Sequence, residues 1–332
     1  MRKIGVLFGG KSGEHEVSLL SATSVIEALD REKYDVVMIG ITKSGQWKLY
    51  EGDVHNLADG SWEKTAADIE VSDLKKLADF ALPVLHGPYG EDGTIQGLFE
   101  MLDVPYAGCG VLSSALCMDK VSAKKIFERM GLPTARYKLV YAEDVKDDLE
   151  SVVKEVEAEL PYTLFVKPSN MGSSVGISKV RNTEELRAAL ALAGKYDRRI
   201  IIEEGINCRE VETGVIGNHK PEVAAVGEIV AKLDFYDYTA KYTDDAGTEL
   251  SIPAKLPAST YEEIRTLAKK AYMALDCSGF ARIDFFVDKD TGQVYINEIN
   301  TIPGFTKYSM FPLMWKEAGV SFRELVERIV AL

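Results

Sequence analysis

The stretch of sequence that decides the fold lies near the C-terminal end. It reads Ala281-Arg282-Ile283-Asp284-Phe285-Phe286-Val287, then Asp288-Lys289-Asp290-Thr291-Gly292, then Gln293-Val294-Tyr295-Ile296-Asn297-Glu298-Ile299-Asn300. Two alternating, β-rich runs flank a polar turn that contains glycine, which is typical of a β-hairpin. A hairpin centred on Thr291 places Asp284 opposite Glu298 and Arg282 opposite Asn300. Because side chains alternate between the two faces of a strand, these four share one face.

The predicted pairing sets two carboxylates against each other, and like charges in that position destabilise a sheet. A hard divalent cation between them reverses the effect. Asp284, Glu298 and Asn300 offer only oxygen ligands, which suits Mg²⁺ bound together with the phosphates of a nucleotide. The alternative is that the acids lie on a solvated outer face of the hairpin, and the spacing alone leaves both interpretations open.

Length and charge restrict the class of protein. A chain of 332 residues is too long for one ordinary hydrophobic core, so two or three domains are expected. Hydrophobic residues make up 46% and charged residues 27%, as in soluble globular proteins. The net charge of −13 argues against a long nucleic-acid partner, because there is no surplus of basic side chains to displace counterions. A small anionic ligand remains possible, since it needs only a few local cations and N–H groups.

The cysteines and apolar runs indicate a cytoplasmic protein. Cys109, Cys117, Cys208 and Cys277 form neither a CxxC pair nor a zinc-binding spacing, and are expected to be buried or free thiols in a reducing compartment. The N-terminal apolar run ends in a turn and is too short for a signal peptide. No run approaches 18 apolar residues, so neither a transmembrane helix nor a membrane partner is expected.

The N-terminal third has the pattern of a doubly wound α/β unit. A buried strand over 3–8 leads through a Gly-rich turn into a helix, and a second strand follows over 34–41. Another buried strand over 81–85 ends at His86. In such units ligands bind at the carboxyl ends of the strands, where the Gly-rich turn and His86 lie.

Two further α/β units are predicted. In the second, helices are expected over 122–130, 149–160 and 183–193, and strands over 163–167, 177–180 and 199–203. In the third, strands over 209–216 and 222–230 precede a polar, aromatic loop over 234–248. A capping box at Ser259 predicts a helix to about Leu275, and a second box at Ser321 opens the terminal helix.

Three polar features suggest a nucleotide site, each with a simpler alternative. Lys167 ends a strand before a Gly/Ser loop whose N–H groups could form an anion nest, although a flexible turn explains the loop equally well. Lys120 starts a helix, where a cation is unfavourable for the dipole unless an anion binds; a surface lysine is the alternative. Glu203 and Glu210 could accept from an adenine amine and ribose hydroxyls, or form an acidic turn between strands.

A set of motifs, in order along nearly the whole chain, resembles that of the D-alanine–D-alanine ligases. The motifs are Gly9-Gly10-Lys11-Ser12-Gly13-Glu14-His15-Glu16-Val17-Ser18, His86-Gly87-Pro88-Tyr89-Gly90-Glu91-Asp92-Gly93-Thr94, Cys117-Met118-Asp119-Lys120, Lys167-Pro168 with Gly172-Ser173-Ser174-Val175-Gly176, Phe235-Tyr236-Asp237-Tyr238 with Lys241-Tyr242, and Glu298-Ile299-Asn300-Thr301-Ile302-Pro303-Gly304-Phe305-Thr306. The resemblance implies a three-domain ATP-grasp α/β fold with an N-terminal doubly wound, Rossmann-like domain. The expected domains are 1–108 for substrate, 109–203 as the central ATP-grasp subdomain, and 204–332 with the metal site and a lid over 234–248.

The resemblance also implies a reaction. ATP phosphorylates the carboxylate of one D-alanine, and the amine of a second D-alanine displaces phosphate to give D-alanyl-D-alanine for peptidoglycan synthesis. A D-alanine–D-serine ligase, a D-alanine–D-lactate ligase, another ATP-grasp carboxylate–amine ligase and a non-catalytic nucleotide-binding module are the alternatives. The family implies D-alanine as the small-molecule partner and a homodimer.

Individual roles follow from the same resemblance. Two Mg²⁺ ions, for which Mn²⁺ can substitute, would bind Asp284, Glu298 and Asn300. The ATP-binding residues would be Lys120, Lys167, Ser173 and Lys241 for the phosphates, and Glu203, Glu204, Ile206 through its backbone, and Glu210 for adenine and ribose. Glu16 is instead an acid in a first helical turn, favoured by the helix dipole.

The substrates would contact residues from both ends of the chain. Arg282 and the Gly304 N–H would stabilise the oxyanion of the tetrahedral intermediate, and Ser309, followed by Met310, would hold the second carboxylate. Glu14 would pair with the ammonium of the first D-alanine, His86 would lie near its carboxylate, and Tyr242 would link the lid to Ser173 and Glu14. Tyr242 and Met310 favour D-alanine at both sites, although Lys307-Tyr308 is a less usual pair in this motif. Selectivity between methyl and hydroxymethyl is modest in an apolar pocket, so side activity on D-serine is expected.

Overall fold

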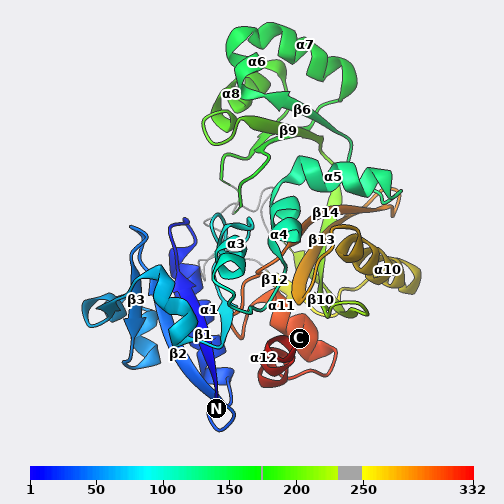
Figure 1. The fold of residues 1–332 in the computed structure, drawn as a ribbon. Coiled ribbons are helices and arrows are strands. Elements are labelled where there is room, and N and C mark those ends of the chain that lie inside the picture. The colour runs from blue at the N-terminus through cyan, green and yellow to red at the C-terminus, as the bar shows by residue number, and fades with distance from the viewer. Residues whose placement is uncertain (173–174, 231–248) are drawn as a thin grey trace.

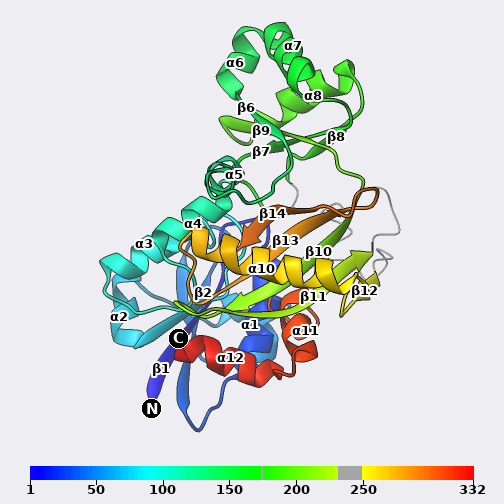
Figure 2. The ribbon, with the colours of Figure 1, turned by 90° about the vertical axis from the view of Figure 1, so that its right-hand side faces the viewer.

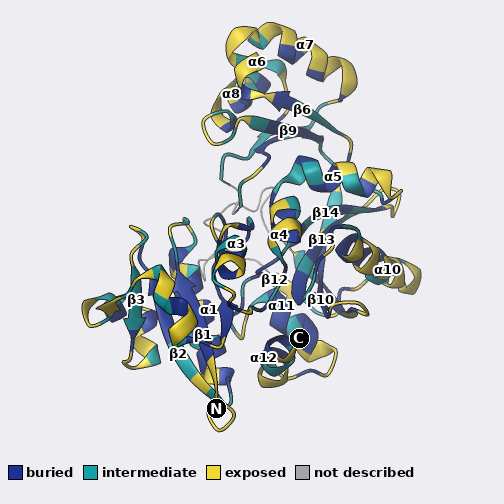
Figure 3. Ribbon diagram, in the orientation of Figure 1, coloured by how far each residue is buried: buried dark blue, intermediate teal, exposed yellow. Residues whose placement is uncertain are grey.

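The computed structural model describes residues 1–172, 175–230 and 249–332, which form three sheets with their own helices (Figure 1). Ser173, Lys241, Tyr242 and the lid predicted over 234–248 lie outside the described residues. Figure 3 shows buried residues concentrated on the strands of the sheets and exposed residues on the outer sides of the helices. Within the described residues, no helix has the length and apolar character needed to cross a membrane.

The N-terminal unit is a five-stranded sheet of order β4-β3-β2-β1-β5, with β1 parallel to both β2 and β5. Its strands are β1 (Arg2–Gly9), β2 (Tyr34–Ile41), β3 (Trp47–Tyr50), β4 (Ala67–Asp68) and β5 (Phe80–Pro83). Its helices are α1 (His15–Ala28), α2 (Leu74–Leu77) and α3 (Thr94–Met101), with single 3₁₀ turns η1 (Val54–Leu57), η2 (Ser61–Lys64) and η3 (Val71–Asp73). The strands predicted over 3–8, 34–41 and 81–85 are confirmed with small shifts. The antiparallel strands β3 and β4 are short, and the sequence did not indicate them.

The central unit is an antiparallel sheet of order β6-β9-β7-β8, which stands apart from the other two sheets in Figures 1 and 2. Its strands are β6 (Tyr137–Tyr141), β7 (Leu164–Pro168), β8 (Ser178–Val180) and β9 (Arg199–Glu204). Its helices are α6 (Ala142–Asp147), α7 (Leu149–Glu159) and α8 (Thr183–Ala193), and the buried apolar side chains of these helices and strands form one cluster whose described members all belong to this unit. The unit therefore has a hydrophobic core of its own.

The C-terminal unit is a sheet of order β12-β11-β10-β13-β14. Its strands are β10 (Cys208–Ile216), β11 (Glu222–Val230), β12 (Glu249–Ser251), β13 (Phe280–Asp288) and β14 (Val294–Asn300). Helix α10 (Ala258–Ala274) covers the face of Ile283 and Phe285, together with α4 (Val111–Met118) and α5 (Lys120–Arg129). Helix α11 (Met310–Glu317) covers the opposite face, and α12 (Phe322–Ala331) packs against α11 and α1. One continuous core joins α11 and α12 to β1, β5 and α1, so the first and third units share their apolar interior.

The hairpin of β13 and β14 follows the predicted pairing at its functional end. Arg282 lies opposite Asn300 and Asp284 opposite Glu298, as expected. The register then shifts, because Phe285 lies opposite Ile296, so the prediction of a hairpin symmetric about Thr291 is wrong beyond Asp284. The shift is a β-bulge, in which Asn297 is the extra residue, and a bulge reorients side chains at sheet edges and active sites. Asn297 consequently lines the same cavity as Glu298.

Two of the predicted helix starts differ from the structure. Helix α10 begins at Ala258, after Pro257, and no side chain caps it, so the capping box at Ser259 is wrong; the serine already lies inside the first turn. Helix α5 begins at Lys120 and not at Ser122, because Asp119 accepts from the Ser122 N–H at 2.8 Å. Ser321 does cap α12, accepting from the Glu324 N–H at 3.3 Å. All four cysteines are free thiols, as expected, and Cys208 alone among them is partly exposed.

Packing in the N-terminal unit requires a glycine at position 40. A Cβ on Gly40 would lie 2.2 Å from the ring of Trp62, a fully buried side chain that also stacks edge-on against Phe8. We expect Gly40→Ala to lower the stability of this unit by about 1–3 kcal/mol, because overpacking a dense core forces side chains and backbone to move. Thermal unfolding would measure the change.

The matched control is Gly97→Ala in α3, where no atom lies within 4 Å of the new Cβ. This variant should be neutral or more stable by up to about 1 kcal/mol, since alanine favours a helix interior. A Gly40→Ala protein as stable as Gly97→Ala would contradict the packing argument.

Candidate active site

A cavity of about 610 Å³ opens between the three units. Its wall combines the turn before α1, the loop after β5, the junction of α4 and α5, strands β10, β13 and β14, and the segment that follows β14. Many residues predicted from sequence line it together: Glu14, His86, Lys120, Glu210, Arg282, Asp284, Glu298, Asn300, Gly304, Ser309 and Met310. Lys167, Glu203, Glu204 and Ile206 are absent from this lining and lie on or beside β7 and β9. The fold therefore brings together motifs from opposite ends of the chain.

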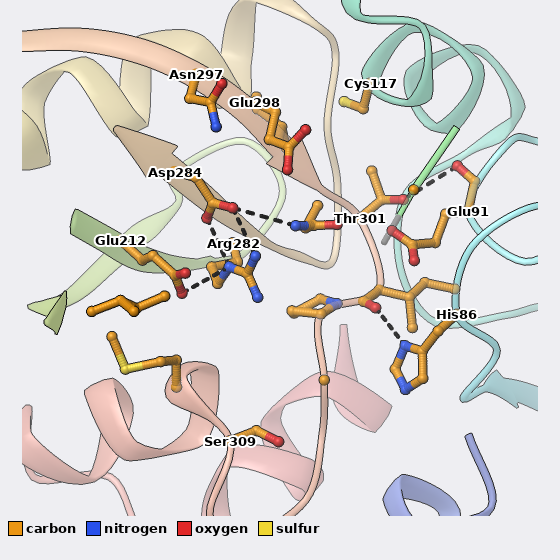
Figure 4. Close-up of a pocket in the computed structure, with 18 of the residues that line it drawn as sticks. His86, Glu91, Cys117, Glu212, Arg282, Asp284, Asn297, Glu298, Thr301 and Ser309 are labelled. Atoms are coloured by element: carbon orange, nitrogen blue, oxygen red, sulfur yellow. Dashed lines mark hydrogen bonds and ion pairs between the residues drawn. The ribbon is translucent and has the colours of Figure 1, made fainter. Parts of the chain in front are cut away.

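Arg282 lies between two acids on the floor of the cavity (Figure 4). Its Nε and Nη2 each donate to one oxygen of Asp284 at 2.7 Å, which makes a bidentate pair. Nε also lies 2.9 Å from Oε2 of Glu212 on β10. Burial disfavours the charged guanidinium, but Asp284 and Glu212 outweigh that effect and raise the pKa of Arg282 well above its ordinary value. The site thus holds a permanent, preoriented cation.

The predicted metal ligands are oxygen donors on neighbouring strands, each already close to a cation. Glu298 lies 3.2 Å from the Lys120 ammonium, and Asp284 is held by Arg282. Asn300, with its amide oxygen turned toward Arg282, accepts from Nη2 at 2.7 Å and donates to Glu91 at 3.2 Å. Within the described residues no group of three His, Cys, Asp or Glu side chains has a metal-binding arrangement. The oxygen-only set fits Mg²⁺ that takes its remaining ligands from phosphates and water.

His86 and Glu91 fix the loop after β5 to the rest of the site. His86 is buried, and burial lowers its pKa, so the ring is neutral. Its Nδ1 lies 2.9 Å from the Ile302 carbonyl and its Nε2 lies 3.0 Å from the Ser21 hydroxyl, which assigns the proton to Nδ1. Glu91 accepts from the Gly87 N–H at 2.7 Å. Burial, and next the charge of Glu14, raise the pKa of Glu91 to about 8.

Glu14 and Gly87 meet at one wall of the cavity. Glu14 occupies the N-cap position of α1, at the start of the helix as predicted. A Cβ on Gly87, whose φ is +72°, would lie 2.6 Å from a carboxylate oxygen of Glu14. Glycine is therefore required there for the close approach of the two loops. Glu16, by contrast, lies in the first turn of the helix, as predicted, and pairs with Lys43.

At the opposite wall, Ser309 begins α11 as its N-cap residue. Its hydroxyl accepts from the Thr306 N–H at 3.1 Å and lies 2.8 Å from the Thr306 hydroxyl. A Cβ on Gly304 would lie 3.3 Å from the Ser309 hydroxyl, so these two predicted residues are neighbours. Met310 packs on Gly227 of β11, where a Cβ would lie 2.7 Å from its terminal methyl.

A buried ion cluster lies beyond the cavity at the end of the central sheet. Glu203 lies 2.9 Å from Lys124 and forms a second, short ion pair with Lys167. Burial would raise the pKa of Glu203, but the two lysines hold it at about 2. The carboxylate proposed for adenine is thus shared between two lysines. Glu204 pairs with Arg136 at 2.7 Å, Ile206 lies between β9 and β10, and Glu210 is exposed at the start of β10.

Comparison with known proteins gives a consistent result over the whole chain. Family models described as "D-ala D-ala ligase N-terminus" and "D-ala D-ala ligase C-terminus" match residues 3–109 and 126–331. The chain belongs to the D-alanine–D-alanine ligase family. It is therefore an ATP-dependent ligase, and the ATP-grasp fold expected from its motifs is confirmed.

Relatives of this ligase align along its full length. It is 53% identical to the D-alanine–D-alanine ligase of Thermoanaerobacter sp. (strain X514), covering 100% of this chain and 96% of the relative. It is 50% identical to that of Bacillus velezensis, covering 98% and 96%. Among solved structures, VanG D-Ala:D-Ser ligase from Enterococcus faecalis superposes with a TM-score of 0.91 at 40% identity, covering 100% and 99%. The D-alanine–D-alanine ligase from Coxiella burnetii gives 0.86 at 33% identity, covering 100% and 95%.

Three ionisable residues of this ligase were missed from the sequence. Glu212 stands at a polar position of an alternating strand, where the side chain is expected to face solvent. Lys124 has the pattern of a surface lysine on a helix. Glu91 stands inside a quoted motif, but nothing in the pattern marks it as buried. One signal in the sequence could have indicated Glu212. It lies two positions after Glu210 on the same strand, so the two side chains share a face of the sheet. Burial of each side chain depends on neighbours far away in the sequence.

The ion cluster around Glu203 should contribute strongly to stability. We expect Glu203→Gln to destabilise the ligase by about 3–5 kcal/mol at neutral pH, because two buried lysines lose their partner. The pKa of Glu203 is depressed in the folded state, so its contribution is fully present above about pH 4.5 and declines as the pH falls toward 2. Thermal unfolding of both proteins at pH 7 and pH 3.5 should therefore show a smaller difference at the lower pH.

Glu204→Gln is the matched control, since its partner Arg136 has a side chain that is 60% exposed. An exposed pair of this kind is worth at most about 1 kcal/mol. Equal losses from the two variants would contradict the buried cluster as a main source of stability.

Proposed function

We propose that this ligase joins two molecules of D-alanine, with ATP as the energy source, to give D-alanyl-D-alanine, ADP and phosphate for peptidoglycan synthesis. The observation that carries the proposal is the Arg282 cation, buried between Asp284 and Glu212 in a cavity that also contains Glu14 and Ser309. Such a cation suits a reaction in which negative charge develops on an acyl oxygen. Family membership and relatives of the same name support the choice of substrate.

The two ends of the cavity suit two amino-acid substrates. Glu14 would pair with the ammonium of the first D-alanine, and neutral His86 would lie beside its carboxylate. Arg282 and the Gly304 N–H would stabilise the oxyanion that forms when the second amine attacks the acyl phosphate. Ser309 would hold the carboxylate of the second D-alanine, with Met310 beside its methyl group.

We assign ATP to the side of the cavity that faces the central unit. Lys120 would contact its phosphates from the cavity wall, and Lys167 would do so from β7 while Lys124 keeps Glu203 neutralised. Ser173 and Lys241 have the same proposed role. The buried cluster of two lysines and one glutamate carries a net positive charge, which favours an anion nearby. Glu203, Glu204, the Ile206 backbone and Glu210 remain the proposed contacts to adenine and ribose.

Asp284, Glu298 and Asn300 would hold two Mg²⁺ or Mn²⁺ ions, which neutralise charge on the transferred phosphoryl group when bound. The chain's own contribution is to present these oxygens on two adjacent strands, with Lys120 and Arg282 beside them. Tyr242 and the lid over 234–248 would exclude water from the acyl phosphate.

We also propose domains 1–108, 109–203 and 204–332, and a cytoplasmic homodimer that binds no nucleic acid or membrane. Light scattering should then give twice the chain mass of 36.6 kDa.

D-Serine is the second candidate for the second site, because VanG, 40% identical to this chain, is a D-Ala:D-Ser ligase. Met310 packs tightly on Gly227 and leaves an apolar wall beside Ser309, which favours D-alanine. An apolar wall rejects an added hydroxyl only weakly, so slow use of D-serine is compatible with the site. D-Lactate would attack through a hydroxyl in place of an amine, and Tyr242 argues against it, because the resemblance implies that depsipeptide-forming relatives often lack this tyrosine.

The substrate prediction is tested by ATP-dependent phosphate release with D-alanine, L-alanine, D-serine and D-lactate, with products identified by mass. Of the four compounds supplied singly, we expect D-alanine to give phosphate and D-alanyl-D-alanine. When D-alanine and D-serine are supplied together, we expect D-alanyl-D-serine to form at a lower rate. L-Alanine is the matched control for stereochemistry. No dipeptide from D-alanine in the presence of Mg²⁺ would contradict the proposed function.

The role of Arg282 gives a separate prediction. Arg282→Ala should lower kcat by about 10²–10³-fold, the usual cost of losing a preoriented oxyanion contact, while ATP affinity stays close to that of the parent enzyme. Steady-state kinetics and equilibrium nucleotide binding would measure both. Arg209→Ala is the control, because Arg209 forms an equally close pair with Glu228 on the same sheet, outside the cavity. Turnover that survives in Arg282→Ala would remove the oxyanion role.

A further inference from the structure

Arg282 has two acidic partners, of which one alone belongs to the proposed metal site. The Asp284 carboxylate accepts from Nε and Nη2 at 2.7 Å, and Oε2 of Glu212 lies 2.9 Å from Nε (Figure 4). The exposed fractions of the side chains are 19% for Arg282, 12% for Asp284 and 7% for Glu212. Glu212 is therefore the more deeply buried acid, and neither the metal nor the substrate assignments use it.

The register of the sheet explains why Arg282 extends toward both acids. Strands β10 and β13 pair so that Glu212 lies opposite Asp284 and Gly214 lies opposite Arg282, with all four positions on one face. A Cβ on Gly214 would lie 2.7 Å from the Trp315 indole nitrogen, so α11 packs directly on the sheet there. The guanidinium consequently lies over the neighbouring pair, where Glu212 and Asp284 would otherwise repel each other across the strands.

Asp284 cannot serve Arg282 and a divalent cation equally well. Both of its oxygens accept hydrogen bonds from the guanidinium, and a metal ion bound to the same oxygens repels that positive charge. Glu212 lies on β10, two strands away from Glu298 and Asn300 on β14, which is about 10 Å at the usual strand spacing. Glu212 is thus placed to serve Arg282 without joining the ligands of the metal.

We propose that Glu212 is a positioning residue that receives Arg282 when Asp284 turns to the metal ions, keeping the guanidinium in place and its charge balanced. The exchange needs only a rotation of the side chain, because Nε is already at ion-pair distance from Glu212 while its hydrogen bond goes to Asp284. The contribution of Arg282 to turnover rests on the proposed function; its competition with a cation for Asp284 does not.

Glu212→Gln tests this role with two readouts. In the variant, position 212 is neutral, and Asp284 is the one of the two partners that keeps its negative charge. Arg282 therefore competes more strongly with the metal cation for the Asp284 carboxylate. We expect the affinity of the free enzyme for Mn²⁺, measured by electron paramagnetic resonance, to fall about tenfold, the size of one charged hydrogen bond. We expect kcat to fall by a similar factor, with KM for ATP within about twofold.

A double-mutant cycle separates this mechanism from a simple loss of negative charge. If Glu212 acts through Arg282, Glu212→Gln leaves Mn²⁺ affinity unchanged in an Arg282→Ala background. An equal loss in both backgrounds would show that Glu212 acts on the cation directly, and would overturn the proposal. Glu228→Gln, which removes another acid paired with an arginine on this sheet, should leave Mn²⁺ affinity unchanged.

Glu212→Asp repeats the cycle if the glutamine variant does not fold, because it retains the buried charge and shortens its reach by one methylene. The same fall in Mn²⁺ affinity, again absent without Arg282, is expected. Unchanged affinity in a folded Glu212→Asp or Glu212→Gln protein would also overturn the proposal. Absence of dipeptide synthesis by the parent enzyme would count against the proposed function alone, since metal titrations need no turnover.

Discussion

The opposition of Asp284 and Glu298 across β13 and β14 is the constraint on which the active site depends. Two carboxylates facing each other in a partly buried position are unfavourable unless positive charge lies beside them. Arg282 supplies it from the same strand as Asp284, and Lys120 supplies it from the start of α5. The hairpin therefore holds α5 in two ways, through the ion pair of Glu298 with Lys120 and through the apolar core that Phe127 shares with β13 and β14. Each of the two opposed carboxylates therefore has a cation beside it before any ligand arrives.

Much of the C-terminal sheet was predictable, because a period of two and a glycine-containing turn are local signals. Arg282, Asp284, Glu298 and Asn300 shared one face as expected, since alternation depends only on the strand itself. The bulge at Asn297 was not predictable, because an extra residue in one strand leaves no mark in the hydrophobic pattern. The start of α10 failed for a different reason: Ser259 matched a capping sequence, but the backbone after Pro257 was already helical.

The site residues that belong to a motif were predictable. The charged side chains that pair with them were not. A motif contained Lys167, and the family resemblance gave a role to Glu203, yet nothing in the sequence indicated that Lys124 completes their buried cluster. Glu212 and Glu91 look like ordinary charged residues until α11 and the loop after β14 cover them. Burial of a charged side chain is a property of the tertiary neighbours, so resemblance to a family gives residue types while the structure gives their electrostatic surroundings.

The distribution of apolar cores has a mechanical consequence. Phe280, Phe305 and Trp315 belong to the same apolar cluster as Val25 and Leu82, and this cluster fastens the first unit to the third. The central sheet has a separate core, and its contacts with the rest include polar ones such as the 2.7 Å pair of Arg199 with Asp119. Water can replace polar contacts at low cost, but it cannot replace a shared apolar interior. The apolar interior thus joins the first unit to the third but not to the central unit, whose boundary runs beside the residues proposed to hold ATP.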